Sequence, residues 1–192
     1  MNTRNMTIEG YLDVFGSSAP VPGGGGATAV IGGLACSACM MVCSLTVGKK
    51  KYADIEEYVK ALSDRVKGER EEFLKLADAD AEAFEPLSRA YSNKDVTDEE
   101  MDTLLENAGN VPLRIMELGV ALLEDIRYMQ ENGSRLAVSD AECAFGMAET
   151  VIKNGATLVK CNTSLMKDKT RAARIDGKVE QFLAQYRAYL LK

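Results

Sequence analysis

Four consecutive glycines, Gly23 to Gly26, follow Pro20-Val21-Pro22 and lie inside a stretch, Ser17 to Gly48, that has no charged residue. Glycine lets a backbone approach a ligand closely, and a helix start offers unpaired N–H groups to an anion or a carbonyl. The run lacks the Lys-Ser/Thr ending of a phosphate-binding loop, and no strand precedes it, so a nucleotide site is disfavoured. A flexible turn is the alternative. Because ordering four glycines costs chain entropy, we favour contact with a small molecule.

Asp80 is the second chemical candidate, because it interrupts an apolar helical row formed by Phe73, Leu76, Phe84 and Leu87. A carboxylate in such a row is costly to bury unless it is paired, and burial raises its pKa toward the range useful for acid-base catalysis. A structural carboxylate that caps a helix or pairs with a lysine is the alternative. We favour a catalytic role, since charged side chains are rarely buried without a reason.

Two further polar groups stay open between structural and functional roles. Lys49-Lys50-Lys51 directly follows the uncharged stretch, where the lysines either complement a helix dipole or recognise a carboxylate-bearing ligand. Ser139, with Glu142 three residues on, reads as the start of a helix. Asp140 is then either a first-turn acid favoured by the dipole or an inward-facing group, and the pattern does not decide between them.

Composition excludes several function classes. The chain has no His, which removes Ser-His and Cys-His catalysis and His-ligated zinc. A net charge of −6 over 192 residues disfavours nucleic acid as a partner. Cys36, Cys39 and Cys43 share a helix face, but without a fourth ligand nearby we predict small buried thiols and no metal. The odd cysteine count and the mixed charges of residues 1–13 predict a cytoplasmic protein.

The remaining pattern predicts an all-α, single-domain helical bundle over residues 1–192, with a long uncharged helix at its centre. Ala29, Gly33 and Ser37 recur every four residues, which lets another helix approach closely, within the chain or across a dimer. The uncharged segment is long enough to span a bilayer, but the other segments are amphipathic and charged, so we predict a buried helix and no membrane. Helices are expected at 6–15, 27–47, 55–90, 97–131, 139–154, 156–165 and 172–191, the fourth disturbed near Gly109 to Pro112.

Five motifs, in order, are similar to those of the cyclodeaminase/cyclohydrolase family of folate enzymes. This family comprises the cyclodeaminase half of formiminotransferase-cyclodeaminase and the bacterial methenyltetrahydrofolate cyclohydrolases. The motifs cover most of the chain: Ser18-Ala-Pro-Val-Pro-Gly-Gly-Gly-Gly26, Ser44-Leu-Thr-Val-Gly-Lys-Lys-Lys-Tyr52, Asp78-Ala-Asp-Ala-Glu-Ala-Phe84, Val111-Pro-Leu113 and Ser139-Asp140. The sequence departs from the family pattern at Ser134 and Leu158, where the family often has Asn.

The resemblance implies an all-helical homodimer that takes a tetrahydrofolate derivative as substrate and needs no metal or other cofactor. The family's acid-base Asp maps onto Asp80, the residue that the apolar row also selects. By the same match, substrate-binding roles go to Gly23, Gly24, Gly25, Lys49, Lys50 and Asp140. Lys49 is also a catalytic candidate, because Lys49 or Lys50 would bind the glutamate tail or help to position water.

The expected reaction is hydrolysis of 5,10-methenyltetrahydrofolate to 10-formyltetrahydrofolate. Formiminotetrahydrofolate cyclodeaminase, which releases ammonia and closes the methenyl ring, is the close alternative. The Gly-Gly-Gly-Gly and Gly-Lys-Lys-Lys-Tyr forms of the motifs resemble the stand-alone cyclohydrolases more. Outside this family, a helical membrane or assembly protein and a thiol metal protein remain as alternatives.

Overall fold

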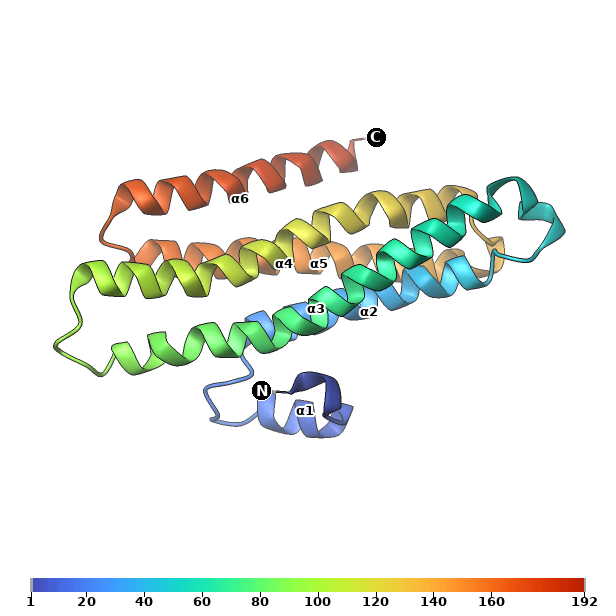
Figure 1. Ribbon diagram of the computed structural model, residues 1–192. Helices are drawn as coiled ribbons and strands as arrows, with labels where there is room; N and C mark the ends of the chain where they lie inside the picture. The colour runs from blue at the N-terminus through green and yellow to red at the C-terminus, as the bar shows by residue number, and fades with distance from the viewer. Residues whose placement is uncertain (1, 192) are drawn as a thin grey trace.

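The computed structural model describes residues 2–191, so the first and last residues of the predicted domain 1–192 lie outside it. Within this part the chain is helical and has no strand, which confirms the predicted all-α, single-domain bundle (Figure 1). The α-helices are α1 (Ile8–Phe15), α2 (Gly24–Ser44), α3 (Glu56–Ala90), α4 (Asp98–Asn132), α5 (Val138–Leu165) and α6 (Lys169–Leu190). Short 3₁₀ turns, η1 (Thr3–Asn5), η2 (Lys50–Ile55) and η3 (Arg135–Ala137), join or precede them.

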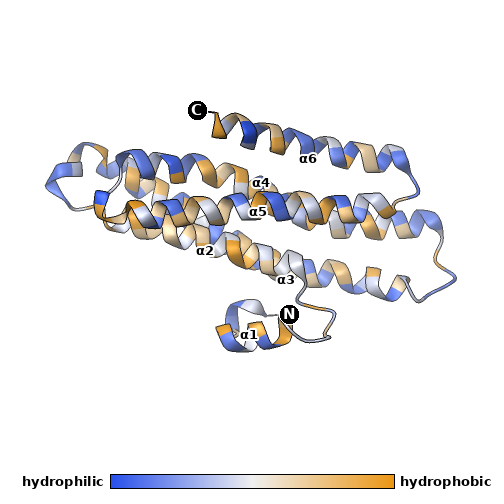
Figure 2. Cartoon of the chain, turned by 180° about the vertical axis from the view of Figure 1, so that it is seen from behind, coloured by the Kyte–Doolittle hydropathy of each residue, from blue (hydrophilic) through white to orange (hydrophobic). Residues whose placement is uncertain are grey.

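Helix α2 lies at the centre of the bundle and packs against α3, α4 and α5. Figure 2 shows α2 without the strongly hydrophilic residues that mark outer helices such as α6. Its small residues let α3 approach closely. A Cβ added at Gly32 would lie 2.4 Å from the Phe73 ring, so only glycine fits there. Of the three residues at four-residue spacing, Ala29 and Gly33 are buried within the chain and Ser37 is exposed.

The structure corrects several predicted helix boundaries and confirms one: α2 begins at Gly24 and α6 at Lys169, each three residues earlier than expected. The segments 139–154 and 156–165 form one continuous helix, α5, because Gly155 lies against α4, where a Cβ would stand 2.8 Å from the Met116 side chain. Ser139 does not cap α5, which begins one residue earlier, after η3. The capping box of Thr97 and Glu100 at the start of α4 is present as predicted. Helix α4 also continues through Pro112, where a disturbance was expected.

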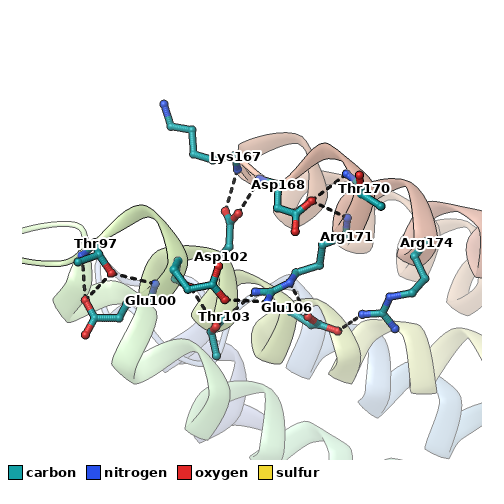
Figure 3. A network of polar contacts seen from close by, with 11 residues as sticks. Thr97, Glu100, Asp102, Thr103, Glu106, Lys167, Asp168, Thr170, Arg171 and Arg174 are labelled. Carbon is teal, nitrogen blue, oxygen red and sulfur yellow. Dashed lines mark hydrogen bonds and ion pairs between the residues drawn. The ribbon is translucent and has the colours of Figure 1, made fainter.

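Helix α6 is fastened to α4 by a network of carboxylates and backbone donors (Figure 3). Asp102 is buried and accepts hydrogen bonds from the backbone N–H groups of Lys167 and Asp168, at 2.7 and 2.6 Å. Asp168 in turn caps α6, and Arg171 reaches back to Glu99 on α4 at 2.9 Å. These contacts fix the turn between α5 and α6, and with it the end of α5 that faces the glycine run.

Candidate functional site

The carboxyl group of Asp80, on α3, lies against the first turn of α2. Its Oδ2 accepts a hydrogen bond from the backbone N–H of Gly26 at 2.8 Å. Gly23 is the N-cap residue of α2 and has no side chain to perform this task. Asp80 therefore caps α2 from outside the helix, and its charge faces the positive end of the helix dipole. The structural role considered for Asp80 is thus present, and it places the carboxyl group at the glycine run.

Glycine at position 25 is what permits this contact. A Cβ at Gly25 would stand 2.0 Å from Asp80 Oδ1, far inside van der Waals contact. A side chain at this position would displace the carboxyl group. The glycine run is therefore ordered around Asp80, and the alternative of a flexible turn does not describe Gly24 to Gly26, which begin α2.

A cavity of about 210 Å³ opens beside this contact. The predicted residues Gly23, Gly24, Gly25 and Asp80 all line it, so the structure brings this part of the predicted site together. Helices α3, α4 and α5 supply the remaining wall, which is mostly apolar and contains Phe84, Leu87, Tyr91, Ala108, Pro112, Leu158, Cys161, Asn162 and Leu165, with Pro20 and Val21 from the loop before α2.

The surroundings of Asp80 suit a group that exchanges protons. Burial raises its pKa above the usual value, and the hydrogen bond from Gly26 works in the opposite direction. Oδ2 is engaged by that hydrogen bond, whereas Oδ1 makes no hydrogen bond to any residue from 2 to 191. One carboxylate oxygen is thus held in place by the helix start, and the other is left to act on a bound molecule.

The predicted lysines and Asp140 lie at the other end of α2. The 21 residues of α2 span roughly 30 Å at 1.5 Å per residue. Beyond that end, Lys49 Nζ donates to Ser134 Oγ at 3.2 Å, Lys50 is exposed, and Asp140 is half-buried in the first turn of α5. Within one chain, therefore, the structure does not bring Lys49, Lys50 or Asp140 to Asp80.

Sequence reasoning missed two polar residues of the cavity, Tyr91 and Cys161. Tyr91 stands eleven residues after Asp80 on the row that contains Phe84 and Leu87, so the helical spacing carried the signal. Cys161, on α5, could not be placed without knowing that α5 packs against the start of α2.

The structure disfavours the two alternatives from other protein classes. No group of three or more Cys, Asp or Glu side chains in the described chain is arranged to hold a metal ion. Cys36, Cys39 and Cys43 are buried in the core, and burial raises the pKa of the Cys36 thiol. One helix, α2, is long and apolar enough to cross a bilayer, but 56% of its most hydrophobic window is buried within the bundle.

A larger open groove of about 730 Å³ lies between α4 and α6. Its wall includes Arg114, Glu117, Glu124 and Lys178, and it does not contain Asp80 or the glycines. Two of these charged side chains, Arg114 and Glu117, form an ion pair at 2.6 Å. Because it lacks the capped carboxyl group, we place the functional site at the smaller cavity.

The fold and the site together define a class of protein. It is an all-helical bundle in which the central helix begins on glycines, and a carboxyl group from the next helix is held at the first turn of that central helix. The family model described as formiminotransferase-cyclodeaminase matches residues 7–181. The chain belongs to this family. The match covers the glycine run, Asp80, the lysines and Asp140 together.

Individual relatives agree with this assignment. A methenyltetrahydrofolate cyclohydrolase of Methylorubrum extorquens is 33% identical over 94% of this chain and 90% of its own length. A formimidoyltransferase-cyclodeaminase of Dictyostelium discoideum is 27% identical over 85% of this chain, which spans only 31% of that longer protein. The crystal structure of a formiminotetrahydrofolate cyclodeaminase from Thermotoga maritima superimposes with a TM-score of 0.91 at 25% identity, covering 97% of this chain and 92% of that one.

Proposed function

We propose that this chain is an enzyme that hydrolyses 5,10-methenyltetrahydrofolate to 10-formyltetrahydrofolate. The observation that carries the proposal is the Asp80 carboxyl group, which lies in the wall of a cavity and is fixed through Oδ2 at the start of α2, with Oδ1 unpaired among residues 2–191. The similarity to the Methylorubrum cyclohydrolase, which extends over nearly the whole of both chains, supports the same reaction.

Hydrolysis of the methenyl group requires a positioned water molecule and a general base. The methenyl carbon lies between two nitrogens and carries positive charge, so it is already electrophilic. Asp80 takes a proton from the attacking water as the new C–O bond forms, and returns it to the ring nitrogen when that C–N bond breaks. The remaining hydroxyl proton of the adduct is released to solvent as the formyl C=O bond forms, so one proton leaves for each cation hydrolysed. The reaction so written uses no metal and no cofactor, and the tetrahydrofolate derivative is the substrate.

Formiminotetrahydrofolate cyclodeaminase activity is the second candidate. The Thermotoga structure favours it, because that protein bears this name and shares the fold at a TM-score of 0.91. The same carboxyl group would serve, since loss of ammonia also needs a proton moved at the substrate. Cyclohydrolase is preferred, because the higher identity, 33%, belongs to the relative that carries that name.

A homodimer would complete the site. At about 210 Å³ the cavity is smaller than the roughly 300–1,000 Å³ typical of small-molecule sites, and its wall contains no basic side chain to meet a substrate carboxylate. Helix α2 presents an uncharged exposed face on which Leu34 and Met41 are 55% and 50% exposed. Large exposed apolar side chains on an uncharged face favour a protein partner.

A second copy is the partner that also supplies the missing charge. The exposed face of α2 has its midpoint near Ser37, which is about twelve residues from both Gly25 and Lys49. Antiparallel packing of two α2 helices about this point places the partner subunit's Lys49 beside Asp80. There the ammonium group would bind the glutamate tail of the substrate or position water.

The five free cysteines fit our further proposal of a reducing, cytoplasmic compartment.

Two assays on the purified protein test the activity. Loss of the methenyl chromophore after enzyme addition, above the uncatalysed rate, is the expected result. Release of ammonia from formiminotetrahydrofolate without chromophore loss would instead establish the second candidate. If neither substrate reacts, the proposal of an enzyme in this pathway is wrong.

A further inference from the structure

Tyr11, on α1, has a hydroxyl group that the fold buries without a partner. Its side chain is 8% exposed, and its oxygen forms no hydrogen bond with any residue of the described chain. A buried hydroxyl left unpaired costs on the order of 1–3 kcal/mol. Phenylalanine would fill the same space without that cost, so the hydroxyl calls for an explanation.

The hydroxyl lies beside the donor that holds Asp80. Its oxygen stands 3.6 Å from the position of a Cβ on Gly26, the residue whose N–H binds Asp80 Oδ2. Burial raises the pKa of Tyr11, and the charges of Asp80 and Asp78 add to this effect. The phenol therefore stays protonated and remains a donor throughout the neutral range.

Of the two carboxylates that act on Tyr11, Asp78 receives two hydrogen bonds at one of its oxygens. Thr3 donates to Asp78 Oδ1 from its backbone N–H at 2.8 Å and from its hydroxyl at 2.7 Å. These bonds, with the ion pair of Arg4 and Glu71 at 2.8 Å, hold the N-terminal segment on α3. Asp80 is the carboxyl group on which we expect the Tyr11 hydroxyl to act, because the hydroxyl lies beside Gly26, the Asp80 donor, and the charge of Asp80 affects the pKa of Tyr11 more than that of Asp78 does.

Tyr11 approaches this carboxyl group from outside the substrate cavity. The cavity wall contains Asp80 and Gly23 to Gly25, but neither Tyr11 nor Gly26. A substrate in the cavity would touch Asp80 and leave Tyr11 untouched. Any effect of Tyr11 on the reaction must therefore pass through Asp80.

We propose that Tyr11 is a positioning residue for Asp80, and that its hydroxyl donates to the Asp80 carboxylate through one bridging water. Such a water is nearly as effective as a direct hydrogen bond. The bond would favour the ionised carboxylate and hold the carboxyl group in place at the cavity wall. For its catalytic consequence the inference rests on the function proposed above.

Few titratable side chains surround Asp80. The titratable side chains around the carboxyl group are Tyr11 from α1, Asp78 and Tyr91 from α3, and Cys161 from α5. Helices α2 and α4 contribute only glycines, Ala108 and Pro112 to the cavity wall. No cation lines the cavity, so loss of one neutral donor should be measurable.

The test replaces Tyr11 by Phe and follows the Asp80 carboxyl carbon by NMR as a function of pH, with the signal assigned by its absence in Asp80→Asn. We expect the pKa of Asp80 to rise by about half to one unit, because a donor to the charged form is lost. The acid limb of kcat/KM should move by the same amount, with KM unchanged.

Tyr189→Phe is the matched control. The Tyr189 hydroxyl donates to the carbonyl of Leu123 at 2.8 Å, far along α4 from the site. This variant should lose stability and leave both titrations unchanged, whereas Tyr11→Phe should shift both. An unaltered Asp80 titration in folded Tyr11→Phe overturns the proposal. The NMR measurement needs no substrate, so it decides the role of Tyr11 even if the wild-type protein proves inactive on methenyltetrahydrofolate.

Discussion

The two ends of α2 handle charge in opposite ways. At the glycine end, a half-buried carboxyl group from α3 is fixed by a backbone N–H at 2.8 Å. At the far end, Lys49 reaches only the hydroxyl of Ser134, at 3.2 Å, and Lys50 is exposed. The glycine end thus holds a carboxyl group in a fixed position, whereas the lysine end carries ammonium groups with few hydrogen-bond partners. This difference fits the proposal made above, in which one chain holds the reacting carboxyl group and a second copy supplies the charge that recognises the substrate.

Replacing Asp80 by Asn tests the glycine end most directly. The amide keeps the shape of the side chain but cannot accept a proton from water, so kcat should fall by roughly a thousandfold while substrate still binds. Steady-state loss of the methenyl chromophore measures the rate, and quenching of tyrosine fluorescence measures binding. Asp78→Asn, which alters the neighbouring carboxylate bound by Thr3, should leave kcat nearly unchanged. An active Asp80→Asn variant would exclude Asp80 as the base.

Gly25→Ala separates the position of the carboxyl group from its presence. The new Cβ would meet Asp80 Oδ1 at 2.0 Å and push it aside, so we expect activity to fall about a hundredfold. The control is Gly68→Ala on α3, where a Cβ would meet nothing within 4 Å and should stabilise the helix by roughly 1 kcal/mol. Equal activity in the two variants would show that the close contact with Asp80 has no catalytic importance.

Glu69, midway along α3, sharpens the comparison because its carboxyl group is buried without a donor. One of its oxygens is unpartnered in the described chain, and burial is the main cause that raises its pKa to about 7. Between pH 4.5 and about 7, Glu69 is therefore protonated in the folded state and largely ionised in the unfolded chain. The free energy of unfolding should fall by about 1–2 kcal/mol as the pH rises from 4.5 to 7, an amount reduced by partial solvation.

Glu69→Gln should abolish that part of the pH dependence and leave kcat unchanged, as urea unfolding at several pH values and the chromophore assay can measure. Glu142→Gln, at an exposed position, is the control and should change neither quantity. If Glu69→Gln lowers kcat as strongly as a change at Asp80, then the buried carboxyl group in the middle of the bundle also takes part in catalysis, and the assignment of the chemistry to the glycine end of α2 is wrong.

Lys49→Ala addresses the lysine end and should have the smallest effect. Loss of one charge-assisted contact, about 1.5 kcal/mol, raises KM roughly tenfold with little change in kcat. Mixing Lys49→Ala with Asp80→Asn subunits should then restore turnover with the wild-type KM, because one of the two sites in each mixed dimer holds both wild-type residues. Lys67→Ala, at an exposed position on α3, serves as the control. Absence of rescue in proven mixed dimers would contradict a site shared between subunits.

Most of the architecture could be predicted because its signals are local. Helical periodicity located α3 and α4 to within a residue or two, and the capping box at Thr97 marked the start of α4. A helix break was expected near residue 155 because glycine has a low helix propensity. That expectation was wrong. In the structure the same glycine lets α4 and α5 touch at Met116, and packing outweighs propensity.

The site could be predicted only in part. An acid in an apolar row selected Asp80 from the sequence alone, since helical spacing reveals which face a residue occupies. That Asp80 caps α2 depends on how two helices cross, which no local pattern contains. The same limit applies to Lys49, Lys50 and Asp140, which motif resemblance grouped with the glycines and which the fold of one chain keeps apart.

The glycine contacts of α2 have a consequence for how this chain tolerates insertions. Gly25 lies against Asp80, and Gly32 lies against Phe73, so both pairs are seven residues apart on antiparallel helices. These two contacts, at equal spacing on both helices, fix the register of α3 along α2. An extra residue between Phe73 and Asp80 would preserve helical content and the core contact at Phe73. It would also rotate the carboxyl group by about 100° around α3, away from the first turn of α2. In the mechanism proposed above, the length of this seven-residue interval is therefore as much a requirement for activity as the carboxylate itself.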